Sequence, residues 1–489
     1  MDSSYEGKTM SGAHGSSSTS ELRQVDDTLW EIPASARRDM RVPARIFADR
    51  ELLDTIARDT SLEQLQNVAT LPGVVDAVLA MPDIHQGYGF PVGGVAAMEL
   101  PDGVVSPGGV GYDINCGVRL LALPLGAEDL AGRREALVHE ISRAVPAGAG
   151  KESGLFRRTA DLLDQVLREG SRAIGSEEDV EHTESRGCLP GADPGAVSER
   201  AKERGQGQIG TMGSGNHFVE VQRVDRILDR AAAEAFGLRA GQVTVLIHSG
   251  SRGLGHQVCT DYVRRMDQAM RRYGIELPDR QLACAPACSP EGRDYLAAMA
   301  AAANFAWANR QGIADAVRTA VERVLGREAA EGTRQVYDVA HNVAKVEEYG
   351  GRRVLVHRKG ATRAFPAGSA EIPEAYRLVG QPVFIPGSMG TASYVLAGDP
   401  GSMVRSFGTT CHGAGRLLSR TAARKRIGGG ELRRQLEQQG IVVRCPSPKG
   451  LAEEAPFAYK DVERVVEIVE RAGLARRVAR LVPLGVVKG

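Results

Sequence analysis

The chain has 489 residues, which is enough for one large domain or for two to three ordinary ones. Hydrophobic residues make up 42% and charged residues 25%, and lysine plus arginine equal aspartate plus glutamate at 61 each. This balance is typical of a soluble globular protein; it excludes a strongly basic polyanion binder, and no apolar run approaches the roughly 18 residues of a membrane span.

The N-terminal segment differs in composition from the rest of the chain. Residues 1–24 are rich in serine and glycine and contain GSSSTS, which predicts a disordered tail. The first ten residues lack the charged-then-apolar pattern of a secretory signal, so we expect a cytoplasmic protein. No solenoid repeat or low-complexity linker follows. The charged range 175–204 contains two prolines and is predicted to be a surface connection.

Three short runs of mainly β-branched and apolar residues end abruptly at polar motifs. Residues 243–247 lead into HSGSRG, residues 354–356 into HRKG, and residues 382–385 into PGSMG. Each run is predicted to be a buried strand that delivers a loop. Because sites are usually built on such loops, we expect the functional site at strand ends.

Two ranges are predicted to be helical. Residues 296–326 are rich in alanine with few helix breakers, and residues 461–482 bring four valines between 462 and 469 to one face. Helices and strands alternate without a regular βαβ rhythm. The sequence therefore favours an α+β fold over a doubly wound parallel sheet.

Six motifs are rich in ionisable and polar residues, and five of them also contain glycine. In chain order they are 81–90 (MPDIHQGYGF), 111–119 (GYDINCGVR), 210–220 (GTMGSGNHFVE), 248–253 (HSGSRG), 337–342 (YDVAHN) and 411–416 (CHGAGR). The chain has 58 glycines, and in four of these motifs glycine stands close to a histidine. Since glycine weakens regular elements, this pattern indicates places where the backbone must approach a ligand closely.

The ionisable residues of the motifs suit a transition metal. Asp113 and Cys116 lie three residues apart, and four of the ten histidines (His217, His248, His341 and His412) sit in the later motifs. An aspartate, a cysteine and several histidines together suit Mn, Zn or a similar ion better than Mg alone. A thiolate can also bridge two ions, and paired ions are common in phosphoryl chemistry. Taken singly, each residue is equally compatible with a polar core group or, for Cys116, with an inert small hydrophobe.

His412 differs from the other histidines because the backbone after it, Gly-Ala-Gly, carries almost no side chain. Such a loop can admit a nucleotide phosphate against the imidazole, which is a covalent nucleophile when neutral. A plain glycine-rich turn remains the alternative. The chain contains no G-x-x-x-x-G-K-[ST] motif and no K-x-D-G motif, so lysine is not the obvious carrier of a nucleotide.

A basic cluster follows the same motif. It consists of Arg416, Arg420, Arg424, Lys425 and Arg426. The cluster is compatible both with a track for phosphates and with a solvated helix face.

The motifs DINCGVR, GSGNHF, HSGSRG, AHN, PGSMGTASY and HGAGR, in this order, resemble those of the RtcB family of RNA-splicing ligases. The closing LGVVKG also resembles that family's C-terminus, and the resemblance runs from about residue 40 to the end of the chain. It implies a single large RtcB-like catalytic domain over residues 25–489, with mixed sheets flanked by helices. It also implies a GTP-dependent RNA ligase that acts in tRNA splicing, in RNA repair or in both.

The resemblance implies roles for individual residues. His412 would be the guanylated nucleophile, with Arg420 and Asp83 as further active-site residues. Two Mn²⁺ ions would be held by Asp113, Cys116, His217, His248 and His341. The guanylate pocket would comprise Asn216, His217, Phe218, Val219, Glu220, His341, Asn342, Pro386, Gly387, Ser388, Met389, Ser393, His412, Gly413, Ala414, Gly415, Tyr459 and Lys488.

The implied reaction has three steps. His412 attacks the α-phosphate of GTP and releases pyrophosphate, GMP passes to an RNA 3′-phosphate, and a 5′-hydroxyl then attacks the activated end. A 2′,3′-cyclic phosphate is first hydrolysed. The implied partners are RNA ends of these kinds and an archease-type activator, with no membrane. A metal-dependent RNA-end phosphatase or nuclease is the first alternative, and a non-catalytic RNA-binding or chaperone-type protein is the second.

Overall fold

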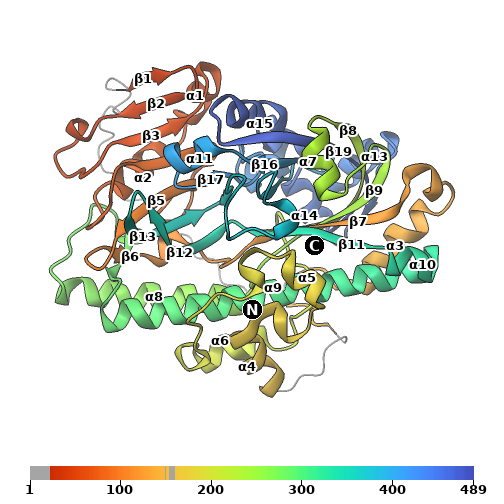
Figure 1. The fold of residues 1–489 in the computed structure, drawn as a ribbon, viewed down its shortest axis with the longest axis horizontal. Coiled ribbons are helices and arrows are strands. Elements are labelled where there is room, and N and C mark those ends of the chain that lie inside the picture. The colour runs from red at the N-terminus through yellow and green to blue at the C-terminus, as the bar shows by residue number, and fades with distance from the viewer. Residues whose placement is uncertain (1–21, 149, 154–159) are drawn as a thin grey trace.

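The computed structural model describes residues 22–148, 150–153 and 160–489. Two large sheets lie side by side above a pair of long helices (Figure 1). Of the predicted N-terminal tail, residues 1–21 lie outside the described residues, and the first strand begins at Arg23. In the part of the chain that the structure covers, no helix combines the length and apolar character that crossing a membrane requires.

The first sheet is mixed, because β3 and β4 run parallel while its other neighbours are antiparallel. Across the sheet its strands are β1 (Arg23–Asp26), β2 (Leu29–Ile32), β3 (Ala44–Phe47), β4 (Val78–His85), β5 (Val92–Glu99), β13 (Arg352–Lys359) and β12 (Asn342–Tyr349). The strand predicted at 354–356 is therefore the centre of β13.

The second sheet is also mixed, since β18 pairs parallel with β19 and the other pairs are antiparallel. Across the sheet its strands are β11 (Arg334–Ala340), β7 (Gly117–Gly126), β9 (Gln242–Ser249), β8 (Phe218–Ile227), β19 (Ala475–Lys488), β16 (Ser393–Gly398) and β15 (Pro382–Ile385), with β18 (Val442–Arg444) beside β19. Two small antiparallel pairs are β6 (Val104–Val105) with β10 (Ala285–Pro286) and β14 (Ala361–Arg363) with β17 (Thr409–Cys411). The strands predicted at 243–247 and 382–385 are confirmed as β9 and β15.

The helices surround the sheets. They are α1 (Arg50–Ile56), α2 (Ser61–Val68), α3 (Arg134–Ala144), α4 (Ala160–Glu169), α5 (Glu177–Glu181), α6 (Glu199–Gly205), α7 (Arg230–Phe236), α8 (Arg252–Arg272), α9 (Pro290–Leu325), α10 (Arg327–Glu331), α11 (Pro400–Arg405), α12 (Arg420–Arg426), α13 (Gly429–Gln438), α14 (Pro448–Glu453) and α15 (Val462–Arg471). The expected α+β architecture, with mixed sheets flanked by helices, is confirmed.

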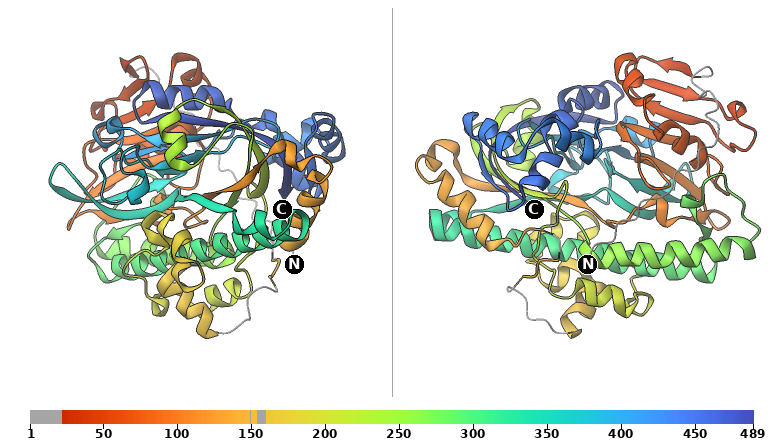
Figure 2. Two further views of the ribbon diagram at one scale, coloured as in Figure 1. Left: turned by 45° about the vertical axis from the view of Figure 1, so that its right-hand side comes forward. Right: turned by 180° about the vertical axis from the view of Figure 1, so that it is seen from behind.

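Helix α9 is the central helix of the fold and confirms the helix predicted at 296–326. It starts where Ser289 caps the backbone N–H of Gly292 and Pro290 occupies the first turn. Its first half packs into the core of the first sheet and its second half into the core of the second sheet. Helices α4 and α6 cover the outer side of α8 and α9 (Figure 2). A helix enclosed in this way needs small or apolar residues on most of its faces, and the alanine-rich sequence supplies them.

The helix predicted over 461–482 is correct only in its first half. The four valines between 462 and 469 are buried on α15, in a cluster where the two sheets meet. Gly473 then adopts a φ of +68°, a conformation that commonly ends helices, and β19 begins two residues later. The helical prediction for 475–482 is therefore wrong.

The surface connection predicted over 175–204 is wrong for its first part. Asp179 and Glu184 are buried, where Asp179 pairs with Arg318 and Glu184 pairs with Lys345. Buried charges require such partners, so these residues hold the segment against the core instead of exposing it to solvent.

Candidate active site

The register of four neighbouring strands brings the predicted metal ligands to one edge of the second sheet. Gly117 at the start of β7 pairs with Ala340 at the end of β11 and with Ser249 at the end of β9. Phe218 at the start of β8 pairs with His248 of β9. Cys116, His217, His248 and His341 therefore lie at the same edge, although 225 positions separate the first from the last in the sequence.

The side chains of these residues converge on one another. The Cys116 Sγ lies 3.2 Å from His248 Nε2 and 3.4 Å from His217 Nε2. The Nε2 atoms of His248 and His341 are 3.3 Å apart, and His217 Nε2 lies 2.8 Å from a carboxylate oxygen of Asp113. The five residues form two groups that share Cys116, and each group could hold a metal ion.

Burial controls the charge of these groups. It lowers the pKa values of His248 and His341 well below the usual range, so both imidazoles are neutral and present lone pairs. Burial raises the pKa of the Cys116 thiol well above its usual range. For Asp113 burial opposes ionisation, but the neighbouring His217 holds the pKa of this carboxyl at about 2. Converging neutral imidazoles, a thiol and a carboxylate fit a transition-metal site.

His412 follows β17, and its imidazole lies beside this cluster, with its ring centroid 5.0 Å from that of His341. One oxygen of the buried Asp83 carboxylate, Oδ2, lies 2.5 Å from His412 Nδ1. The same oxygen accepts hydrogen bonds from the backbone N–H groups of His412 and Gly413, at 3.0 and 3.2 Å. The carboxylate thus orients both the ring and the loop that carries it.

Asp83 is able to carry a negative charge despite its position. Burial alone would favour the neutral acid, but the nearby His412 holds the pKa of Asp83 below its usual value. Lys460 contributes to this, and its ammonium also donates to the carbonyls of Pro82 and Ile84, on either side of Asp83. An ionised Asp83 can only accept the hydrogen bond from Nδ1–H, which leaves Nε2 of His412 as the free lone pair.

A cavity of about 270 Å³ joins His412 to the metal-ligand cluster. It contains most of the residues that the sequence predicts for a nucleotide site. The predicted nucleotide-site, metal-ligand and catalytic residues that line it are Asn216, Phe218, Glu220, His341, Asn342, Pro386, Gly387, Ser388, Met389, Ser393, His412, Gly413, Ala414, Gly415, Tyr459, Lys488, Arg420, Asp113, Cys116 and His248. Val219 instead packs in the core of the second sheet, and Asp83 lies behind His412.

One end of the cavity carries a buried acid and a buried base. Phe218 and Lys488 are register partners on β8 and β19, and the Lys488 ammonium lies 5.5 Å from the Phe218 ring centroid. Glu220 accepts a hydrogen bond from Gln222 at 2.6 Å. Burial raises the pKa of Glu220 to about 8 and lowers that of Lys488. This end therefore offers a hydrogen-bond donor and an acceptor, and the Glu220 carboxyl changes its charge close to neutral pH.

The predicted basic cluster divides into two parts. Arg416 lines the cavity, where it pairs with Glu454 at 3.2 Å and donates to the Tyr459 hydroxyl at 3.0 Å. Arg420 borders both this cavity and a second one of about 650 Å³, which His217 also lines. The remaining three basic residues lie further along α12, and Arg424 pairs there with Glu453.

The glycines of the motifs make room for protein atoms more than for a ligand. A Cβ atom on Gly213 would lie 2.2 Å from His217 Nδ1, and one on Gly250 would lie 2.3 Å from an Asp113 oxygen. A Cβ on Gly415 would lie 2.2 Å from the Asp83 carbonyl oxygen. Gly413 alone among these has space, because its nearest neighbour would be 3.5 Å away. The reason inferred from the sequence, close approach of a ligand, is therefore incomplete.

Several residues of the cavity were given no role by the sequence analysis. They are His85, Tyr112 and Lys359, which lie within quoted motifs, and Glu454, which does not. Lys359 ends β13 and donates to the carbonyl of Phe90 at 3.0 Å, and burial lowers its pKa to about 7. Its place directly after a predicted strand was a usable signal, whereas Glu454 stands at the end of a helix with no motif around it.

Comparison with known proteins agrees with this arrangement. A family model described as tRNA-splicing ligase RtcB matches residues 64–489. The Thermococcus kodakarensis protein named tRNA-splicing ligase RtcB is 54% identical over 478 residues, covering 96% of this chain and 99% of that protein. The Archaeoglobus fulgidus protein of the same name is 52% identical over 478 residues, with the same coverage of 96% and 99%. The Mycobacterium tuberculosis protein named RNA-splicing ligase RtcB is 54% identical over 438 residues, covering 87% and 100%.

Proposed function

This chain belongs to the RtcB family, and we propose that it joins RNA ends through a guanylated His412. The protein is an RNA ligase. Its substrates in this proposal are RNA 3′-phosphate or 2′,3′-cyclic phosphate ends and 5′-hydroxyl ends, with GTP as the source of GMP. We assign the catalytic domain to residues 25–489, its setting to tRNA splicing or RNA repair, and its location to the cytoplasm.

The contact between Asp83 and His412 carries the proposal. Because Oδ2 of Asp83 accepts from Nδ1–H, Nε2 of His412 is available to attack the α-phosphorus of GTP. The new N–P bond forms as the bond to the β-phosphate oxygen breaks and pyrophosphate leaves. The positive charge that develops on the ring lies next to the Asp83 carboxylate, which stabilises it.

The second and third steps return His412 to its starting state. An oxygen of the RNA 3′-phosphate attacks the phosphorus of the His412-linked GMP, the N–P bond breaks, and the RNA end carries GMP. A 5′-hydroxyl then attacks the activated 3′-phosphate and GMP leaves. Solvent takes up the proton that the hydroxyl loses. Histidine suits this role because its covalent intermediate splits one difficult transfer into two easier ones.

Asp113, Cys116, His217, His248 and His341 would hold two Mn²⁺ ions, with Cys116 shared between them. When bound, such ions neutralise phosphate charge and favour in-line displacement. Most of these residues are buried, and electrostatic effects are stronger there than in water.

Glu220 and Lys488 would recognise the guanine base. An ionised carboxylate accepts from the base's N–H donors and an ammonium donates to its carbonyl, which no other base satisfies in the same way. Arg420 and Arg252 border the second cavity, and we assign this cavity to the RNA backbone. An archease-type activator is part of the proposal as an accelerator of the first step.

The test is to label the protein with GTP carrying a radioactive α-phosphate in the presence of Mn²⁺. We expect label on the wild type and none on His412→Ala, whereas His139→Ala, which changes an exposed histidine of α3, should label like the wild type. The bond should be lost in acid and retained in alkali, as expected for a phosphoramidate. Absence of label with every divalent ion tested, with and without an archease, would refute the proposal. Release of phosphate from RNA ends without GTP would identify a phosphatase instead.

A further inference from the structure

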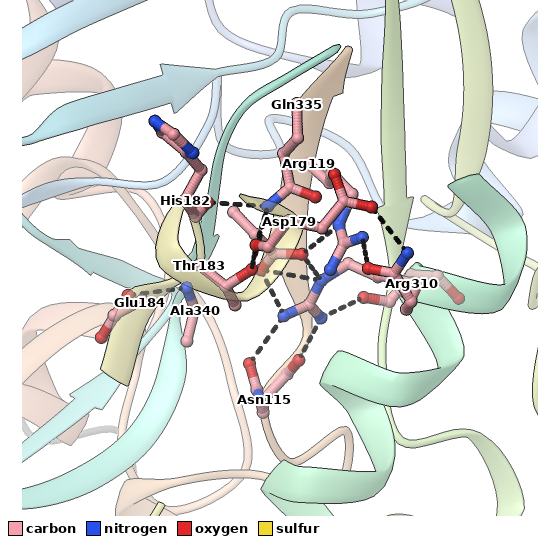
Figure 3. Close-up of polar contacts among 12 residues, drawn as sticks. Asn115, Arg119, Asp179, His182, Thr183, Glu184, Arg310, Gln335 and Ala340 are labelled. Atoms are coloured by element: carbon pink, nitrogen blue, oxygen red, sulfur yellow. Dashed lines mark hydrogen bonds and ion pairs between the residues drawn. The ribbon is translucent and has the colours of Figure 1, made fainter. Parts of the chain in front are cut away.

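Arg310 lies near the middle of α9 and is fully buried, so polar protein atoms must satisfy its charge (Figure 3). Its Nε and Nη2 donate to the Asp338 carboxylate at 2.9 and 2.8 Å. Its Nη1 donates to the backbone carbonyls of Asn115 at 2.7 Å and Ser249 at 2.9 Å, and Nη2 also donates to Asn115 Oδ1 at 3.1 Å. All three nitrogens are thus engaged.

The partners of Arg310 flank the metal-ligand cluster in sequence. Asn115 immediately precedes Cys116, and Ser249 immediately follows His248. Asp338 lies on β11, the strand that leads to His341. A single rigid, planar guanidinium therefore connects the backbone beside two ligands and the strand that carries a third.

The backbone at Asn115 needs this support. Asn115 has a φ of +51°, a conformation that non-glycine residues rarely adopt, and it starts the turn that delivers Cys116 to the site. Its side-chain nitrogen, Nδ2, donates to the carbonyl of Ala303 on α9 at 2.7 Å. On the other side of Cys116, Gly117 lies so close to Arg310 that a Cβ there would be 2.9 Å from the guanidinium carbon. The turn is therefore packed against α9 on both sides of Cys116.

We propose that Arg310 is a positioning residue that sets the separation of Cys116 and His248, and through it the metal affinity of the site. This inference rests on the metal dependence in the proposed function. No described hydrogen bond joins Arg310 to the converging ligand atoms, so it positions them through the two carbonyls and the Asn115 side chain that it holds. Groups that fix metal ligands from behind commonly change metal affinity by about 10- to 100-fold when altered.

Arg119 provides a matched control. It is also fully buried and also pairs with Asp338, at 2.8 Å, and its other described hydrogen bond goes to Gln311. None of its described hydrogen bonds goes to Asn115 or Ser249. Replacing either arginine by lysine keeps the charge beside Asp338 and removes the planar fork, but only Arg310→Lys releases the two carbonyls.

The experiment is a titration of each metal-free protein with Co²⁺, followed by the absorption of the cobalt–thiolate bond of Cys116. Denaturant unfolding of each variant is measured in parallel, and affinities are compared at a temperature where all remain folded. We expect Arg310→Lys to bind Co²⁺ about 10- to 100-fold more weakly, with a shifted thiolate band. Arg119→Lys should also lose stability, but it should keep the Co²⁺ affinity and the absorption spectrum of the wild type.

Equal Co²⁺ affinity in Arg310→Lys and the wild type, or equal losses in the two arginine variants, would overturn the inference. Should Arg310→Lys fail to fold, Asn115→Gly replaces it, since glycine accepts the positive φ and removes only the side-chain contacts. An affinity about tenfold weaker is then expected, and an unchanged one overturns the inference. A wild type that binds neither Co²⁺ nor Mn²⁺ would instead overturn the metal dependence of the proposed function.

Discussion

Replacing Asp83 by asparagine tests how the chain activates His412. In Asp83→Asn an amide oxygen can occupy the position of Oδ2 and accept the same three hydrogen bonds, while the carboxylate charge is lost. Full charges at the 2.5 Å separation of Oδ2 and Nδ1 interact by about 6 to 7 kcal/mol at an effective dielectric constant near 20. With a third to a half of the ring charge developed in the transition state, about 2 to 3 kcal/mol is lost, which slows guanylation by about 30- to 150-fold.

The assay is single-turnover labelling of the protein with α-labelled GTP, with denaturant unfolding measured beside it. In this variant the new amide nitrogen would replace Oδ1 of Asp83, which is buried and has no hydrogen-bond partner among the described atoms, so a modest loss of stability is also expected. Glu347→Gln serves as the control, because it removes the charge of a buried carboxylate that pairs with Arg358 and does not contact His412. That variant should lose stability and keep its labelling rate. Labelling of Asp83→Asn at the wild-type rate would refute the reasoning, since the carboxylate charge would then have no part in the first step.

Three other perturbations test the same site. Because burial raises the pKa of the Cys116 thiol, a metal ion must displace its proton, and calorimetric titration should show an affinity that rises about tenfold per pH unit between pH 6 and 8; a flat profile would contradict this. Burial raises the pKa of Glu220 to about 8, so GTP binding should strengthen from pH 7 to pH 9 as the carboxylate forms, and Glu220→Gln should remove that increase. Gly415→Ala places a Cβ 2.2 Å from the Asp83 carbonyl at a φ of +75°; we expect labelling of His412 to fall at least tenfold, and normal labelling would show that the loop relaxes at little cost.

The sequence predicted the parts of the fold that depend on local pattern. The strand at 382–385 matches β15 in both bounds, and the alanine-rich range is helical from residue 296 to the end of α9 at Leu325. The helical prediction was wrong for 475–482. Apolar and charged residues continue beyond Gly473 much as they do in α15, but the chain there forms β19. The helix ends at Gly473, which has a positive φ, and hydrophobic periodicity does not predict where a single residue ends a helix.

The residues of the site likewise divide into those that the sequence predicts and those that only the folded structure reveals. Histidines and cysteines beside glycines can be found in a sequence, because their chemistry is rare and their motifs are compact. Lys359 and Glu454 reach the cavity only through tertiary packing, and their residue types alone do not distinguish them from surface residues. Asp179 and Glu184 were assigned to the surface because their segment is charged, yet the partners that make burial tolerable, Arg318 and Lys345, lie far along the chain.

The buried charges under the metal-ligand cluster also explain why α9 is not purely apolar. A buried ion pair gains little stability over apolar side chains of similar volume, because the cost of removing both charges from water offsets their attraction. Arg119, Arg310 and Asp338 are nevertheless fully buried together. Apolar side chains could fill this space but could not hold the carbonyls of Asn115 and Ser249 in fixed directions. The polar group at this point of α9 therefore contributes placement of Cys116 and His248, which dispersion contacts do not specify, and its contribution should appear in metal affinity more than in the free energy of unfolding.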